Sequence, residues 1–168
     1  TITGHALLKQ YEGGDTLFLH ADTLRAVDEH PVNRKNVKDT SVTWRALYAY
    51  HKVKFFRNDI QGKCDSLVYS GKDSLMRLYG HSSLRDKAPV LWSEKNQLTG
   101  EKIEMKISGG EIINIFLKNK ALIVSQVESR QESERNPDTL VGKDSFMYNQ
   151  IKGKQMTGYF KENNLSKI

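Results

Sequence analysis

The stretch that indicates the fold of this chain most clearly is Leu19-His20-Ala21-Asp22-Thr23-Leu24. It sets out an apolar residue, any residue, Ala or Gly, a charged residue, any residue and a second apolar residue. The same pattern returns at Ile60-Gln61-Gly62-Lys63-Cys64-Asp65, where the last position is polar, at Leu98-Thr99-Gly100-Glu101-Lys102-Ile103 and at Ile151-Lys152-Gly153-Lys154-Gln155-Met156. Self-similarity of this kind is the sequence signature of a repeat architecture.

The spacing of the copies supports a repeat. They begin at positions 19, 60, 98 and 151, so successive copies are 41, 38 and 53 positions apart. The long third interval contains the polar run Ser125 to Asp138, and removing roughly a dozen inserted residues restores a period of about 40. In the last three copies Asn58, Asn96 or Asn149 stands two residues before the first apolar residue, which makes coincidence a poor explanation.

Apolar residues around these copies alternate with polar ones, and this period of two is typical of a half-buried strand. Two such runs flank the turn residues Gly109-Gly110 and would face each other in a hairpin: Ile103, Met105 and Ile107 before the turn, and Ile113, Ile115 and Leu117 after it. Helical patterning is confined to Thr43 to Tyr50 and to Ser125 to Arg135. We therefore expect an all-β fold, a repeat-built twisted β-jelly roll or β-solenoid-like roll with units of about 40 residues.

Length and composition are those of one globular domain. The chain has 168 residues, of which 38% are hydrophobic and 27% charged, so residues 1–168 are expected to form a single domain. The last unit stops at Ile168 as another strand begins, and we expect a fragment of a longer array. The segment that opens at Thr1 has no basic region followed by an apolar run, so we expect that any secretion signal has been removed or was never present.

Positive charge is concentrated in one part of the chain. The net charge is +6, and the stretch from Pro31 to Lys63 holds eight basic residues against two acidic ones. An anionic partner is expected from this excess, whether nucleic acid, a phosphorylated lipid or a membrane surface. An ordinary solvated face is the alternative explanation.

Residues with catalytic potential do not form a recognisable set. None of the five histidines lies in a His-Glu-x-x-His or nucleophile-turn pattern, and the sequence has no Walker-type loop. His20 and Asp22 would share a strand face, which suits a metal or an acid/base pair, but a solvated polar face is the simpler reading. Cys64 is the only cysteine and excludes an internal disulfide. We expect no enzyme, no metal and no cofactor.

Several of these segments resemble the OstA-like proteins, a family that includes the periplasmic bridge of lipopolysaccharide transport and the N-terminal part of the outer-membrane translocon. The resemblance lies in Gly4-His5-Ala6-Leu7, in Leu19 to Leu24, in Val53 to Tyr69 and in Pro89 to Glu101. The residues of these motifs are most similar to those of the Bacteroidota-type OstA-like proteins. It implies a periplasmic β-jelly roll whose lumen shields acyl chains, and association with other OstA-like proteins edge to edge. The stretches Asp28 to Val42 and Ser125 to Asp138 depart from the short bridge proteins.

The expected function is therefore a non-catalytic lipid-binding module in lipopolysaccharide transport and outer-membrane assembly. Burial of an acyl chain contributes about 0.8 kcal/mol per CH₂. The residues expected to line the groove are Leu17, Leu19, Leu67, Tyr69, Ile103, Met105, Ile107, Ile113, Ile115 and Leu117, and those expected to attract an anionic headgroup are Lys52, Lys54, Arg57 and Lys63.

Two other functions remain open at this stage. A structural β-repeat scaffold would make protein contacts through its open edge strands, as a homo-oligomer or with related proteins, and its inward residues would form a dry core. Nucleic-acid binding would use the basic stretch between residues 31 and 63, where Lys52 to Arg57 interleaves cations with aromatic residues. An amphipathic strand with Val53 and Phe55 inward is the simpler account of that segment.

Overall fold

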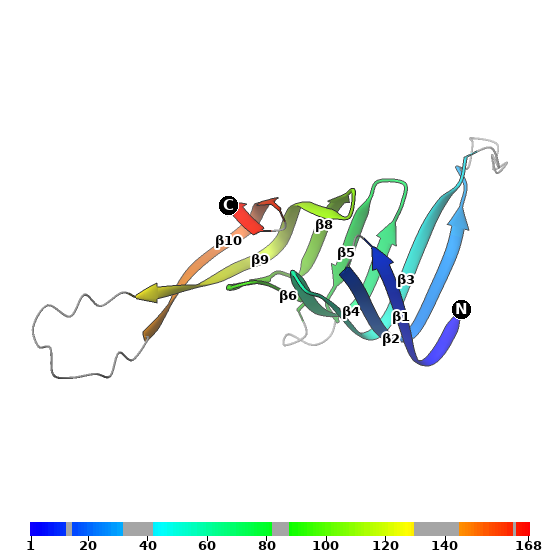
Figure 1. Cartoon of the computed structure of the whole chain (residues 1–168), viewed down its shortest axis with the longest axis horizontal. Coiled ribbons are helices and arrows are strands. Elements are labelled where there is room, and N and C mark those ends of the chain that lie inside the picture. The colour runs from blue at the N-terminus through cyan, green and yellow to red at the C-terminus, as the bar shows by residue number, and fades with distance from the viewer. Residues whose placement is uncertain (13–14, 32–41, 82–87, 130–144, 163) are drawn as a thin grey trace, which may run out of the picture.

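The structure, a computed structural model, describes residues 1–12, 15–31, 42–81, 88–129, 145–162 and 164–168. Regular structure in these residues consists only of strands that pair antiparallel with their neighbours, so the all-β prediction is confirmed (Figure 1). The strands are β1 (Ile2–Glu12), β2 (Asp15–Glu29), β3 (Trp44–Arg57), β4 (Ile60–Ser70), β5 (Leu75–Tyr79), β6 (Val90–Ser93), β7 (Asn96–Thr99), β8 (Lys102–Ser108), β9 (Glu111–Ser129), β10 (Ser145–Lys161) and β11 (Asn164–Lys167).

The strands form two layers because the long strands pass from one layer to the other. One edge of β4 pairs with β3, and its other edge pairs with β6 through Gln61 to Lys63 and with β5 through Ser66 to Ser70. In the same way β9 pairs with β10 on one edge and with both β7 and β8 on the other. We call the two layers the β6–β7 layer and the β5–β8 layer.

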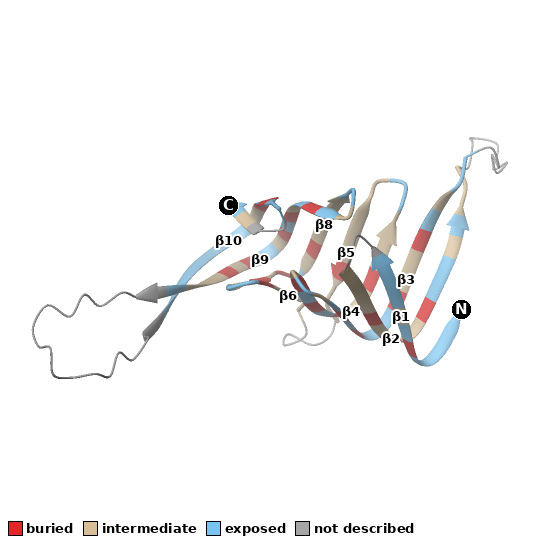
Figure 2. Ribbon diagram, viewed as in Figure 1, coloured by how far each residue is buried: buried red, intermediate tan, exposed pale blue. Residues whose placement is uncertain are grey.

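Pairing closes the centre of the molecule into a barrel of six antiparallel strands, in the order β4, β5, β8, β9, β7, β6 and back to β4. Its interior is filled by aliphatic side chains with essentially no exposed surface: Leu67, Leu78, Leu91, Leu98, Ile103, Leu117 and Ile123. Figure 2 marks the buried residues as red bands along the strands. Strands β1 to β3 extend the sheet from β4, and β10 and β11 extend it from β9.

The repeated pattern lies where the strands turn between the layers. The opening apolar residue of three copies belongs to one register row, which crosses the β6–β7 layer as Leu19, Phe55, Gly62, Leu91, Leu98, Ile123 and Ile151. The closing apolar residues share a row in the β5–β8 layer: Leu24, Ala49, Leu67, Leu78, Ile103, Leu117 and Met156.

These rows correct the predicted second copy. The residue of β4 in the opening row is Gly62 and the residue in the closing row is Leu67, so the equivalent segment is Gly62 to Leu67 rather than Ile60 to Asp65. Gly62 takes the apolar position because the ring of Phe55 covers it: a Cβ there would lie 2.4 Å from that ring. The predicted pattern missed the shift because it required an apolar side chain where the ring of a neighbouring strand fills the space.

We call the point where a long strand turns from one layer to the other its corner. The corner differs between alternate strands. In β2, β4 and β10 two residues separate the small corner residue from the next inward residue, as Asp22 and Thr23 do after Ala21. In β3 and β9 three residues separate them, and two of the three have positive φ: His51 and Lys52 (61° and 52°) and Asn119 and Lys120 (57° and 48°). The register shifts between Tyr50 and Val53, because the extra residue is absorbed as a bulge.

The helical predictions were wrong where the structure describes them. Thr43 to Tyr50 falls almost entirely in β3, and residues 125–129 of the second segment continue β9. Cross-strand pairing outweighs the local helical pattern in both places. The remainder of that segment, and most of the polar run Ser125 to Asp138, lie outside the described residues. The hairpin at Gly109-Gly110 is confirmed, and both glycines have positive φ.

The corner geometry predicts opposite substitution preferences at two exposed lysines of β3. Lys52 has a φ of 52°, whereas Lys54 is in extended strand, paired with His20 and Lys63. At position 52 we expect Gly to be more stable than Val by about 1–2 kcal/mol, because L residues are disfavoured in the left-handed region. At position 54 we expect Val to be more stable than Gly by about 1 kcal/mol.

Urea denaturation of Lys52→Gly, Lys52→Val, Lys54→Gly and Lys54→Val measures both differences. Each comparison removes the same lysine, so the loss of the Lys52–Asp22 ion pair cancels. The same order at both positions would contradict the corner geometry.

Candidate functional site

A cavity of about 350 Å³ lies between the two layers beside the barrel, next to strands β1, β2 and β3. The β6–β7 layer contributes Leu17, Leu19 and Phe55 to its wall. The β5–β8 layer contributes a facing wall that includes Leu47, Leu67, Tyr69 and Met76. This combination of apolar walls and a few polar groups, at the small end of the 300–1,000 Å³ range, is typical of a small-molecule site.

The cavity exists at this end because the barrel closes only at the centre. Inside the barrel the inward side chains of the two layers have essentially no exposed surface. Beyond β4, the strands β1 to β3 continue both layers without short strands that close the ring. Leu17, Leu47 and Met76 remain partly exposed while they pack against the core, so the space between the layers is open here.

One end of the cavity is formed by the turn between β8 and β9. Ile107, Ser108 and the two glycines of the turn all line it. Arg57 holds this turn in place by donating a hydrogen bond from Nη1 to the carbonyl oxygen of Gly110 (2.8 Å). The same guanidinium donates to both carboxylate oxygens of Asp59, at 2.6 and 2.7 Å. Arg57 therefore places a paired cation at the edge of an apolar cavity.

Five of the ten predicted groove residues line this cavity: Leu17, Leu19, Leu67, Tyr69 and Ile107. Four others lie in the filled core of the barrel and not on the cavity wall, namely Ile103, Met105, Ile115 and Leu117. The sequence pattern placed all of these residues on inward faces but did not distinguish a filled region from an open one.

Ile113 was predicted wrongly. Its side chain is 42% exposed, and Ile112 is buried in its place. The register of the β8–β9 hairpin shifts between Lys106 and Ile107, so that Ile107 pairs with Ile112. A bulge of one residue moves the following side chain to the opposite face, and strict alternation cannot anticipate it.

The four predicted headgroup residues do not gather at the cavity. Arg57 alone lines it. Lys52 lies at the corner, 3.3 Å from a carboxylate oxygen of Asp22, and Lys54 and Lys63 project from the outer face of the β6–β7 layer. An anionic group at the cavity would therefore meet Arg57 and not the lysines.

Sequence reasoning missed Leu47, Met76 and Gln10 as lining residues. Leu47 was hidden by the helical interpretation of its segment. The signal that was present is the alternation of inward residues from Phe55 and Val53 to Ala49 and Leu47, once three corner residues are allowed between Val53 and Ala49. Gln10 carries no comparable signal, since it is a polar residue on an edge strand.

The remaining reactive groups have structural surroundings. Burial raises the pKa of the Cys64 thiol to about 12, so a nucleophilic thiolate is not formed at neutral pH. Glu104 lies on the outer face between Lys102 and Lys118, each 2.8 Å away. Partial burial raises the pKa of Glu104, but hydrogen bonds from these lysines outweigh that effect and lower it. Among the described residues, no group of three or more His, Cys, Asp or Glu side chains is placed to hold a metal ion.

Comparison with family models, with curated proteins and with solved structures gives no match to this chain. The OstA-like resemblance thus rests on the residues quoted for it and stays a prediction. The part of the chain that the structure describes contains no helix with the length and apolar character that crossing a bilayer requires.

Two inward residues of β5 lie on opposite sides of the boundary between the open cavity and the filled core. Met76 lines the cavity, whereas Leu78 has no exposed surface. We expect Met76→Asp to reduce the free energy of unfolding by about 1–2 kcal/mol, because water in the cavity can hydrate the carboxylate. Leu78→Asp buries an unpaired charge and should cost more than about 4 kcal/mol.

Urea denaturation of both variants measures the difference, and Met105→Asp should resemble Leu78→Asp, because Met105 also lies in the filled core. Equal destabilisation by Met76→Asp and Leu78→Asp would indicate that the cavity is closed and dry in solution.

Proposed function

We propose that this chain is an OstA-like, repeat-built β-jelly roll that holds an acyl chain of lipopolysaccharide or a related lipid between its two layers. The observation that carries the proposal is the apolar cavity beside the filled barrel. Leu17 and Leu19 face Leu67 and Met76 across it from opposite layers. Such walls favour a hydrocarbon chain because its transfer from water contributes about 0.8 kcal/mol per CH₂.

The size of the cavity limits what it holds. A volume of about 350 Å³ encloses a small ligand, so a lipid with several acyl chains would leave most of them outside. The function that fits is temporary shielding of part of a lipid as it moves along a conduit in the periplasm. No catalytic step and no cofactor are part of this function.

Arg57 places a polar group at one end of the cavity. Its guanidinium is held by Asp59 and Gly110 at one end of the space. Two N–H groups of Arg57 are not used by Asp59 or Gly110. A phosphate or carboxylate of the lipid headgroup near this end would accept a hydrogen bond from them, while the acyl chain extends between the leucines.

Photocrosslinking to lipopolysaccharide tests this function at two neighbouring residues of β3. Leu47 lines the cavity, and Tyr48 projects from the outer face, where its hydroxyl donates to Glu29. A photoactivatable residue at position 47 should crosslink to the lipid, and one at position 48 should not. Leu17→Trp, which fills the cavity from the opposite layer, should abolish the crosslink at position 47.

Two outcomes of this experiment would contradict lipid binding in the cavity. Equal crosslinking at positions 47 and 48 would indicate contact with the surface only. Absence of a crosslink at position 47, in a protein that remains folded, would leave the scaffold function as the better account.

Edge strands support a scaffold function that is compatible with a conduit. Within the described residues β1 pairs only with β2, and β10 is unpaired on the edge opposite β9 from Ser145 to Gly153. Unpaired edges are sites where another strand can add to a sheet. We propose that the β10 edge of one copy receives the β1 edge of a second copy.

Direction and corner type both suit this joint. β1 runs in the same direction as β9, so it can pair antiparallel with β10 on the free side. β10 has the two-residue corner and β1 the three-residue corner, with Gly4 and His5 at positive φ. Alternation of the two corner types would therefore continue from one copy into the next, and a head-to-tail contact of this kind can grow into a filament.

The alternation also predicts the register. β9 places Leu122 opposite Lys152 and Ala121 opposite Gly153, so the equivalent residues of β1, Leu7 and Ala6, should occupy these places in the neighbouring copy. Leu7→Cys combined with Lys152→Cys should give disulfide-linked multimers under mild oxidation, because directly opposed residues have a suitable Cα separation of about 4.5–5.5 Å.

Leu7→Cys combined with Gln150→Cys is the matched control. It keeps both cysteines on the same face but moves one of them two residues out of register, and the diagonal separation of about 7–8 Å is too long for a disulfide. Buried Cys64 can stay in both proteins. Multimers from the control alone, or from neither protein, would exclude this joint.

A further inference from the structure

Two register rows on the outer face of the β6–β7 layer combine cations and aromatic rings without acidic residues. They cross the face from β1 to β10, through β2, β3, β4, β6, β7 and β9. The first row consists of Lys9, Phe18, Phe56, Gln61, Trp92, Gln97, Val124 and Gln150. The second row consists of Leu7, His20, Lys54, Lys63, Val90, Thr99, Leu122 and Lys152. Residues directly opposite one another share a face, so all of these side chains point outward together.

The lysines of this face are exposed and have no carboxylate partner among the described residues: Lys9, Lys54, Lys63 and Lys152. The other outer face is different. On the β5–β8 layer, Lys102 and Lys118 both contact Glu104, and Arg77 contacts Asp73. At the centre of the β5–β8 layer these three cations are therefore paired with carboxylates, whereas the four lysines of the β6–β7 layer are not.

Rings lie between the lysines on the β6–β7 layer. The Phe18 and Phe56 ring centroids are 6.4 Å apart, and Trp92 follows in the same row beyond Gln61. Lys9 lies 5.6 Å from the Phe18 centroid and Lys63 lies 5.5 Å from the Trp92 centroid. The apolar residues Leu7 and Phe56 of these rows are also exposed, by 53% and 44%. Apolar side chains and ammonium groups therefore share one surface.

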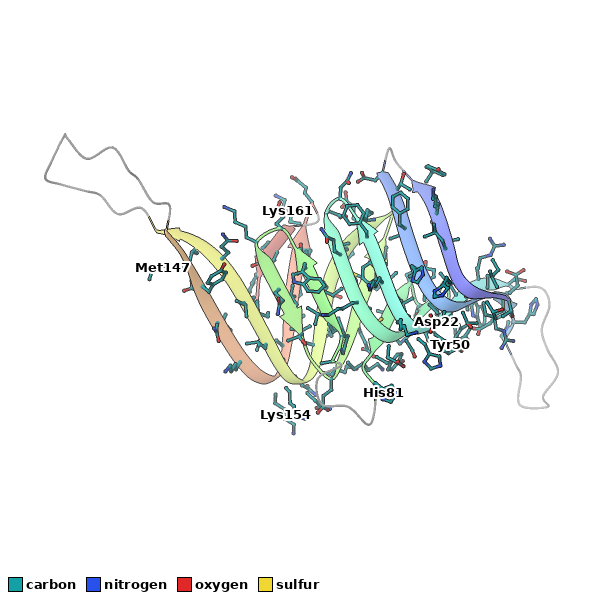
Figure 3. All side chains as sticks on the ribbon, turned by 90° about the horizontal axis from the view of Figure 1, so that it is seen from below. Asp22, Tyr50, His81, Met147, Lys154 and Lys161 are labelled. Atoms are coloured by element: carbon teal, nitrogen blue, oxygen red, sulfur yellow. The ribbon has the colours of Figure 1, made fainter. Side chains whose placement is uncertain are left out.

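We propose that this outer face docks the protein flat on an anionic phospholipid bilayer. Lysines near such a surface are attracted by its negative potential, and aromatic rings insert at the level of the headgroups. The face spans eight strands, and Figure 3 shows how the strands bend away from it at the corner marked by Asp22, Tyr50 and Lys154. A bilayer matches a broad array of this kind.

Single-stranded nucleic acid fits the same chemistry less well. Proteins that bind it without sequence preference guide the backbone along a positively charged groove. The cavity described above lies between the layers, and its wall comes from the opposite face of these strands. The outer lysines are spread across the sheet from β1 to β10 rather than along a channel.

Docking is independent of the proposed lipid cavity. It uses the outward side chains of the β6–β7 layer, whereas acyl-chain capture uses the inward ones. Ordinary phospholipid vesicles test docking alone, and crosslinking at Leu47 tests capture alone, so either can fail without the other.

Co-sedimentation with vesicles is the first measurement. The protein should bind vesicles of mixed phosphatidylcholine and phosphatidylglycerol and should not bind pure phosphatidylcholine. Lys54→Gln combined with Lys63→Gln removes two charges from the centre of the face and should weaken binding roughly thirty-fold, on the basis of about 1 kcal/mol per basic residue. Arg25→Gln combined with Lys118→Gln, on the outer face of the other layer, removes the same charge and should leave binding unchanged within about two-fold.

The two tryptophans report which face contacts the bilayer. Trp92 lies on the proposed docking face, and Trp44 lies on the opposite outer face, where its indole N–H donates to Glu29. With brominated lipid in the vesicles, the single tryptophan of Trp44→Phe should be quenched. The single tryptophan of Trp92→Phe should not be quenched, under conditions where the protein is fully bound.

Three results would overturn the proposal: quenching of Trp44 to the same degree as Trp92, equal binding by the two double variants, or the absence of binding to anionic vesicles. Fluorescence anisotropy with a labelled single-stranded oligonucleotide completes the test. Binding of the oligonucleotide that is lost in the Lys54/Lys63 variant, without any binding to vesicles, would assign the face to nucleic acid instead.

Discussion

The corner in the long strands is the constraint on which the rest of the structure depends. Each long strand has to cross from one layer to the other without losing its inward alternation on either side. Alternate strands solve this differently, with two residues after Ala21 in β2 and with three residues, two of them left-handed, between Ala49 and Val53 in β3. The strain of placing ordinary L residues at positive φ is accepted because both flanking rows of apolar side chains stay in the core.

This constraint also produces the cavity. Short strands close the ring only at the centre of the molecule, where β5 and β8 in one layer and β6 and β7 in the other complete the barrel. Strands β1 to β3 carry the corner without such partners, so their leucines face the opposite layer across an open space. The same kind of residue is therefore core in one place and cavity wall in another, and strand connectivity decides which. The proposed acyl-chain site and the proposed edge contact both follow from strands that are left without a neighbour.

The two outer faces differ because charge is arranged differently on them. On the β5–β8 layer a single carboxylate, Glu104, gathers Lys102 and Lys118. On the β6–β7 layer Lys9 and Lys63 lie over aromatic rings and have no carboxylate partner among the described residues. A lysine paired with a carboxylate has little remaining attraction for an external anion, whereas a lysine over a ring keeps its full charge. The proposed acyl-chain site and the proposed docking face can occupy the same strands, because successive residues of a strand point to opposite faces of the sheet.

By itself, the sequence determined that the chain is all β, that the segment around Gly109-Gly110 is a hairpin, and that residues such as Leu19, Leu67 and Ile103 point inward. These properties follow from local alternation and turn chemistry. Only the tertiary structure decided the register of the second pattern copy, the outward position of Ile113 and the division of inward residues between barrel core and cavity. The physical reason is that a bulge moves side chains to the other face, and ring closure joins residues far apart in sequence. Neither is visible in a local pattern of apolar and polar residues.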